Sequence, residues 1–283
     1  MLFRQDRQDP DTVIAIPQPS HAWLAGQLLR AWGNDAFDPP SPREEVCLGA
    51  ELHDIGWLSW EAAPTLNPDT GRPHGFQDLG PEIHTGLWRD GVRRALAFGR
   101  YPALLVSLHA DTIYTRFYDF DRAEPQEAAL VRRFLDEQHH FQQGCLEALA
   151  DPRHAGFATA ETADRNRLFV AAVDWMSLNI CWGVREVVPI RDVPAAGGRQ
   201  AELRLGPVMG EDADGCRSGG IGRDAGEALW LDPWPFAGDR VEVLCEGRRL
   251  RGRFEDETAM RQALDSAQSV TITAVLTPRP GGS

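Results

Sequence analysis

The chain has 283 residues and a formal net charge of −13, with 29 lysine or arginine residues against 42 acidic ones. A nucleic-acid-binding surface needs a basic stripe, so this balance argues against a nucleic-acid partner and, more weakly, against an anionic membrane surface. The sequence contains no lysine, which excludes any mechanism that uses a lysine nucleophile.

Five cysteines are scattered singly, at Cys47, Cys145, Cys181, Cys216 and Cys245. Without paired spacings, neither a thiolate zinc site nor a disulfide framework is expected, and a reducing compartment is favoured. Residues 1–10 are charged and lack the apolar stretch of a signal peptide, and no run of about 18 apolar residues occurs. We therefore expect a cytoplasmic protein with no membrane partner.

Helical periodicity dominates the first two thirds of the chain. Residues 1–19 are predicted as an extended arm with a short strand at 13–16, and a helix is expected from Ser20 to Trp32. A capping box at Ser41 predicts a second helix, with Val46, His53 and Trp57 on one face. Residues 59–80 read as a long loop of the kind that often carries function. Further helices are expected at 82–98, from 102 onwards, at 125–150 and at 161–182.

The last of these helices is apolar on all sides except for Asp174. A helix of that kind is buried, and a buried carboxylate is costly unless it is paired, hydrogen-bonded or bound to a metal. Asp174 is therefore a candidate ligand.

After Arg185 the apolar pattern changes to the alternation of strands. Strands are predicted at 187–190, 201–205, 228–231, 240–245, 249–254 and 270–276, with a hairpin turn at Glu246-Gly247 and a helix at 257–267. Residues 206–226 are expected to form a Gly-rich loop. The predicted fold is mainly α, with a helical bundle over 20–185 followed by a smaller β-rich C-terminal subdomain over 186–283. That subdomain is interpreted as a scaffold that packs on the helices or forms a homodimer.

Histidine and aspartate residues recur once per predicted helix. The set is His21, His53-Asp54, His84, His109 and Asp174. Taken alone, the His-Asp pair is better explained by a helix end at which Asp54 is solvated and His53 is a satisfied core histidine. Together, six inward nitrogen and oxygen donors favour a site for divalent Fe, Mn, Zn or Co. His139 and His140 read as solvated surface.

The order H…HD…H…H…D resembles the HD-domain superfamily of metal-dependent phosphohydrolases, over residues 20–183, and specifically its binuclear branch. The resemblance implies an HD-like bundle with two metal ions. His21, His53, Asp54 and Asp174 would hold one ion, and Asp54 would bridge to a second ion held by His84 and His109. Trp57 stands where many hydrolytic members carry lysine, and the GYP motif of the cyclic-dinucleotide phosphodiesterases is missing. The HDIGW motif therefore resembles a poorly characterised branch.

The leading hypothesis is a metal-dependent phosphohydrolase that acts on a small phosphoester through a metal-bridging hydroxide, with Asp54, His84 and His109 as catalytic residues. Arg89 could hold phosphate oxygens or could simply be solvated. The side chains of Trp57, Trp60, His74 and Phe76 could form a substrate wall and lid, or belong to the core. Two alternatives use the same ligands: a di-iron oxygenase, and a non-catalytic metal-binding or regulatory protein.

Overall fold

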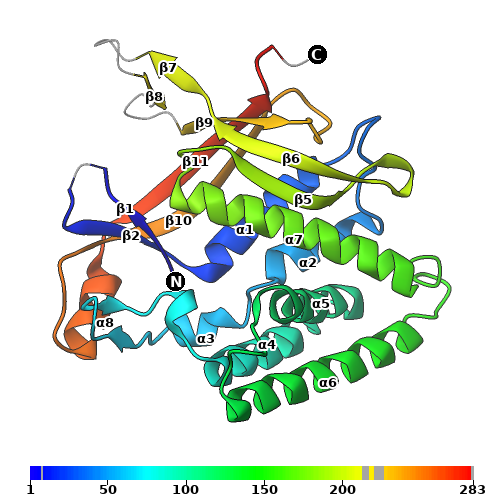
Figure 1. The fold of residues 1–283 in the computed structure, drawn as a ribbon, viewed down its shortest axis with the longest axis horizontal. Helices are drawn as coiled ribbons and strands as arrows, with labels where there is room; N and C mark the ends of the chain where they lie inside the picture. Colours follow the sequence, from blue (N-terminus) through cyan, green and yellow to red (C-terminus); the bar gives the residue numbers. More distant parts are fainter. Residues whose placement is uncertain (8, 212–216, 220–225, 282–283) are drawn as a thin grey trace.

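The computed structural model describes residues 1–7, 9–211, 217–219 and 226–281. It shows a curled, mixed seven-stranded sheet packed against helices (Figure 1). Strands from both ends of the chain form this one sheet, and it shares its core with the helices, so the predicted mainly α class, a bundle with a smaller β-rich subdomain behind it, is wrong. Sequence periodicity identifies single elements, but it does not show that strands from both ends of the chain join one sheet on which the helices pack.

The large sheet combines N-terminal and C-terminal strands. Its order is β1 (Leu2–Gln5), β2 (Thr12–Ile16), β10 (Val241–Arg251), β11 (Ser269–Pro278), β9 (Glu227–Asp232), β6 (Gln200–Pro207) and β5 (Val188–Pro194). Neighbours are antiparallel except β11 and β9, which run parallel. The short strand predicted at 13–16 is confirmed as β2, and β2 pairs with β10, with Ile14 opposite Arg249. The predicted arm is thus part of the sheet.

The helices are α1 (Gln18–Ala31), α2 (Arg43–Leu52), α3 (Trp57–Glu61), α4 (Pro81–Ala95), α5 (Arg100–Phe117), α6 (Pro125–Ala148), α7 (Ala160–Trp182) and α8 (Glu257–Ser266). The predicted long helices are confirmed to within a few residues. Figure 1 shows α1 and α7 between the sheet and the layer formed by α4, α5 and α6. Helix α7 contacts β5 on one side and α5 on the other, which explains why it is apolar on nearly every face.

The largest of three buried apolar clusters among the described residues runs through the helices and the sheet. It includes Leu28 of α1, Val173 of α7, Leu203 of β6 and Val243 of β10. The predicted boundary at residue 185 falls just after α7, and the cluster contains residues from both sides of it. The core therefore fixes α1 and α7, the two helices nearest the sheet, relative to each other.

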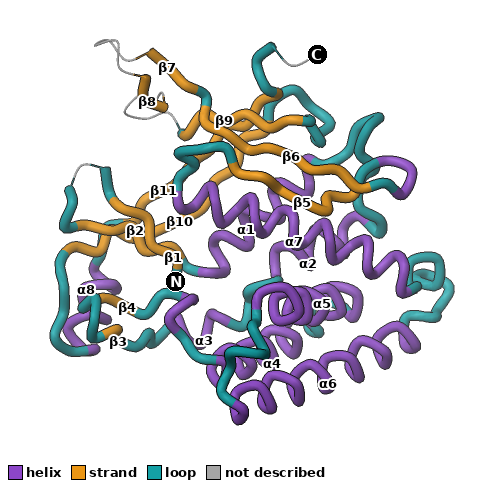
Figure 2. Tube along the Cα trace, viewed as in Figure 1, coloured by secondary structure: helices purple, strands orange, loops and turns teal. Residues whose placement is uncertain are grey.

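Three predicted loops or turns look different in the structure. Strand β10 runs unbroken through the predicted hairpin turn at Glu246-Gly247, so that turn is wrong. A Cβ at Gly247 would lie 2.6 Å from Ile14 Cγ2, so this glycine permits close approach of β2 and not a turn. Short elements, β3 (Leu66–Asn67), β4 (Arg72–Pro73) and the 3-10 turn η1 (Phe76–Asp78), lie in the predicted 59–80 loop (Figure 2).

The predicted 206–226 loop contains an antiparallel pair of short strands, β7 (Met209–Glu211) and β8 (Arg217–Gly219). Residues 212–216 and 220–225, with Cys216 among them, lie outside the described residues. A second 3-10 turn, η2 (Ala196–Gly198), links β5 to β6. In the described part of the chain, no helix is long and apolar enough to cross a membrane.

Candidate metal centre

Five of the six predicted ligands converge where α1, α2, α5 and α7 meet. His21 lies in the first turn of α1, His53 and Asp54 directly after α2, His109 in α5 and Asp174 in α7. All five side chains are buried. The sequence therefore places buried nitrogen and oxygen donors at one point of the helical layer.

The His-Asp pair lies in a turn and not within a helix. Helix α2 ends at Leu52, and the chain continues in tight turns in which Ile55 N–H donates to Leu52 O and Trp57 N–H donates to Asp54 O. This tightening brings consecutive side chains to one site. The turn is also pressed against α4, because a Cβ at Gly56 would lie 2.0 Å from the carbonyl oxygen of Leu87. Glycine at this position of the HDIGW motif is therefore required by backbone contact.

Four ligand atoms form a compact cluster. His21 Nε2 lies 3.2 Å from both His53 Nε2 and Asp174 Oδ1. His53 Nε2 lies 3.2 Å from the same aspartate oxygen. Asp54 Oδ2 is 3.5 Å from His21 Nε2 and 3.6 Å from His53 Nε2. Ligands about 2.0–2.1 Å from a tetrahedral ion lie roughly 3.3–3.4 Å apart, so the separations fit a bound divalent cation.

The tautomer of His53 supports the same reading. Its Nδ1–H donates to the carbonyl oxygen of Ala50 at 2.7 Å, which leaves Nε2 without a proton whenever the ring is neutral. A hydrogen bond from the far ring nitrogen to a backbone carbonyl is the usual way in which a metal-binding histidine is oriented. The His53 lone pair then faces His21 Nε2 and a carboxylate oxygen, an arrangement of acceptors that calls for a cation.

Electrostatics in the metal-free protein reflect this crowding. Burial lowers the pKa of His53, but the carboxylates of Asp54 and Asp174 outweigh it and raise that pKa to about 9. Burial raises the pKa of Asp54, whereas burial of Asp174 is outweighed by His53 and His21, which hold its pKa well below the usual range. A cation would take over the role of the charged imidazole, because both metal-binding imidazoles must be neutral.

His109 lies on the far side of Asp174. Its Nε2 is 3.6 Å from Asp174 Oδ2, while Asp174 Oδ1 faces His21 and His53. His53, His109 and Asp174 form a second group whose ligand atoms lie within 4.8 Å of one another. Burial, with His53 nearby, lowers the pKa of His109 to about 3, so its ring is neutral. His53 belongs to both groups, and Asp174 faces His21 and His53 through Oδ1 and His109 through Oδ2, whereas the resemblance implied that Asp54 would bridge two ions.

His84 lies outside both groups. Its Nε2 donates to the carbonyl oxygen of Phe76 at 2.7 Å, and its ring packs edge-on against Trp57 with centroids 5.4 Å apart. Burial lowers the pKa of His84. The structure therefore brings together His21, His53, Asp54, His109 and Asp174, and it holds the sixth predicted ligand against η1.

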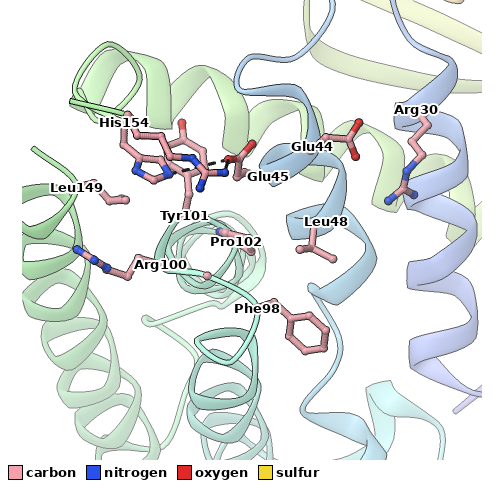
Figure 3. A pocket seen from close by; sticks show the side chains of 12 residues that line it. Arg30, Glu44, Glu45, Leu48, Phe98, Arg100, Tyr101, Pro102, Leu149 and His154 are labelled. Carbon is pink, nitrogen blue, oxygen red and sulfur yellow. Dashed lines mark ion pairs between the residues drawn. The ribbon is translucent and has the colours of Figure 1, made fainter. Parts of the chain in front are cut away.

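A cavity of about 730 Å³ opens beside the cluster, between α5, α7 and β5, and both His109 and Asp174 line it. A separate cavity of about 470 Å³ lies at the other end of α5, around Arg100 and Tyr101 (Figure 3). There Glu45 pairs with Arg153 at 3.6 Å and with His154 at 3.9 Å, and none of the clustered ligands is present. The larger cavity is therefore the one that can present a molecule to the metal centre.

The residues predicted to contact substrate are dispersed. Trp57 is buried and packs on Trp60, His74 Nδ1 pairs with Thr65 Oγ1 at 2.9 Å, and Arg89 pairs with Glu137 at 2.6 Å. These four predicted residues do not line the large cavity, although Phe76 does.

The cavity walls instead use residues that sequence reasoning did not select. Trp175, Trp182 and Arg116 are the main ones. Trp175 directly follows Asp174, and this adjacency is the one signal in the sequence that could have indicated it. The others become neighbours of the site only when α5 and α7 pack together.

A family model described as a protein of unknown function (DUF3891) matches residues 1–252, and the chain belongs to that family. The matched span contains the whole histidine and aspartate cluster and ends just after β10. No curated protein and no solved structure matches the chain.

Proposed function

We propose that this protein is a metal-dependent hydrolase of small phosphoesters, with the metal held by His21, His53, Asp54 and Asp174. The observation that carries the proposal is a cluster of buried ligand atoms beside a cavity that Asp174 lines: His21 Nε2 and His53 Nε2 lie 3.2–3.6 Å from each other and from both Asp54 Oδ2 and Asp174 Oδ1. The order of these ligands along the chain, H…HD…D, supports the same class through its resemblance to HD-type phosphohydrolases.

A divalent cation at this position lowers the pKa of bound water towards neutrality and offsets the charge of phosphoryl oxygens. The chain's own residues supply the remainder. Asp54 and Asp174 offset the charge of the cation, and the Ala50 carbonyl keeps the His53 ring in the orientation that binding needs. His109 lies where the cluster meets the cavity, so its neutral ring can hydrogen-bond to a substrate oxygen.

The overall reaction is a simple hydrolysis. A water oxygen forms a bond to phosphorus, the P–O bond to the organic group breaks, and that group leaves as an alcohol after taking up a proton. Closure of the site by α1, α2 and α7 excludes bulk water, which strengthens each of these electrostatic contacts.

The test combines metal content with phosphate release. Protein purified without chelator is expected to contain at least one equivalent of Fe, Mn, Zn or Co and to release phosphate from p-nitrophenyl phosphate. His53→Ala and Asp174→Asn are expected to lose that metal and at least about 100-fold in rate, because second-shell changes alone cost 10–100-fold. His140→Ala, on the exposed face of α6, is the matched control and keeps both.

Two outcomes would replace this proposal. Iron content with oxygen consumption and no phosphate release favours the di-iron oxygenase alternative. Bound metal without turnover of any phosphoester or oxygen favours a metal-binding or regulatory role.

A further inference from the structure

We infer that the large cavity selects a substrate whose organic group is apolar, an alkyl or aryl chain that ends in one anionic head. The inference rests on the proposed function for the identity of the head, but the apolar chain is recognised by the cavity itself.

An aromatic wall lines the cavity beside the metal centre. Phe76 stacks on Trp182 with ring centroids 6.4 Å apart and an interplanar angle of 17°, and Trp182 meets Trp175 edge-on at 6.3 Å. Ile113 of α5 and Leu168 of α7 also line the cavity. Walls of this composition contribute to binding by removing apolar surface from water.

Two polar groups of these walls are already bonded within the protein. Trp175 Nε1–H donates to the Pro189 carbonyl oxygen at 3.2 Å, so the indole offers the cavity only its apolar surface. Thr112 Oγ1–H donates back to the Leu108 carbonyl oxygen at 2.7 Å. Among the described lining residues away from the charged rim, the side-chain polar groups left for a ligand are those of the candidate metal centre, Gln77 at the exposed rim and the Trp182 indole N–H.

Each of the two arginines at the rim has an acidic partner. Arg116 of α5 lies 3.2 Å from Asp192 of β5, and Arg191 lies 3.6 Å from Glu202 of β6. Asp192 has a left-handed backbone with φ 57° at a bulge in β5, and this conformation turns the strand locally at the mouth. A polyphosphate needs several uncompensated cations, so the walls favour one anionic group, at the metal, over several.

The size of the cavity agrees with this class of molecule. About 730 Å³ is within the range of small-molecule sites, roughly 300–1,000 Å³. Trp175 and Phe117 remain exposed at the mouth, although large apolar side chains are usually covered. A chain entering between them would pass along the aromatic wall with its head towards Asp174.

The experiment separates chain recognition from catalysis. Binding of linear alcohols from butanol to octanol is measured on metal-free protein by calorimetry and by the shift of the tryptophan emission maximum. Each buried methylene is expected to tighten binding about two- to fourfold. Hydrolysis of ethyl, butyl, hexyl and octyl phosphate by the Mn-loaded protein is expected to show the same rise in kcat/KM, with glycerol phosphate the poorest substrate.

Trp175→Ala should flatten both chain-length series. Its matched control is Trp23→Ala, because Trp23 on α1 is exposed to a similar extent, 42% against 39%, and does not line the cavity. Trp23→Ala should keep the full dependence on chain length.

The outcomes are distinguishable. Alcohol binding that does not depend on chain length, or equal turnover of glycerol phosphate and octyl phosphate, overturns the inference and leaves the hydrolase proposal in place. Chain-length-dependent binding without phosphate release from any ester supports the inference and defeats the hydrolase proposal.

Discussion

Gly56→Ala is expected to destabilise the fold and to release the metal. The backbone of Gly56 is helical (φ −63°, ψ −24°), so alanine is not strained there. The added methyl would lie 2.0 Å from Leu87 O and 2.9 Å from Gly91 N. Both neighbours are backbone atoms of α4, which cannot rotate away as a side chain could. We expect a loss of about 2–4 kcal/mol in the free energy of unfolding, at the upper end of overpacking changes.

Helix α4 supplies the controls. Gly86→Ala adds the same methyl to an exposed helical position with nothing within 4 Å, and it is expected to stabilise the protein by about 0.5–1 kcal/mol. Gly91→Ala, with its nearest contact at 3.2 Å from Gly56 N, should fall between the two. For a chain of this size, each kcal/mol shifts Tm by roughly 2–4 °C.

The assays are thermal unfolding and metal content. Gly56→Ala should melt at least about 5 °C below Gly86→Ala and bind less metal, because the turn that carries His53 and Asp54 must move away from α4. If Gly56→Ala is as stable as Gly86→Ala and retains its metal, the contact with α4 does not position the ligands, and the reasoning fails.

Three further results are expected. Metal affinity should rise up to about tenfold per pH unit between pH 6.5 and 9, because His53, with a pKa raised to about 9, holds a proton that the metal must displace. Calorimetry in two buffers should show about one proton released on metal binding near pH 7.5. A metal affinity independent of pH would contradict this. Arg4→Met should lower the free energy of unfolding, measured in urea, by about 2–3 kcal/mol, because the buried Glu227 carboxylate loses its ion-pair partner. Arg251→Met removes an exposed ion pair and should lower it by under about 1 kcal/mol. Equal losses in the two variants would refute this expectation. Cys47 is buried, and burial raises the pKa of its thiol to about 11. Peptide mapping should therefore find Cys47 unmodified by iodoacetamide at pH 8 until the protein is unfolded. Rapid labelling of Cys47 in the native protein would contradict this.

The helical part of the chain was predictable because its periodicity is local. Helix α7 shows how far such a signal reaches. Its all-round apolar surface correctly indicates burial, yet the same pattern fits a helix inside a bundle and a helix between a sheet and α5. The choice between them depends on strands more than a hundred residues apart, β2 and β10, which pair only in the folded state.

The candidate metal site, too, was predictable only in part. The recurrence of His and Asp along successive helices indicates ligands for a cation, and five of those side chains do meet. The position of His84 was not predictable, because the carbonyl that holds it belongs to η1 in a segment without periodicity. The residues of the cavity walls were not predictable either, because Trp182 and Arg116 become neighbours only through the packing of α5, α7 and β5.

The sequence by itself determined the helices, the chemistry of the donors and the need of a buried Asp174 for a partner, because these follow from local spacing and from the cost of burying charge. Tertiary structure alone decided which sheet the termini form, which ligands share one point and what surface a substrate meets. Those outcomes depend on contacts between distant segments, whose free energy is gained only when the whole core closes.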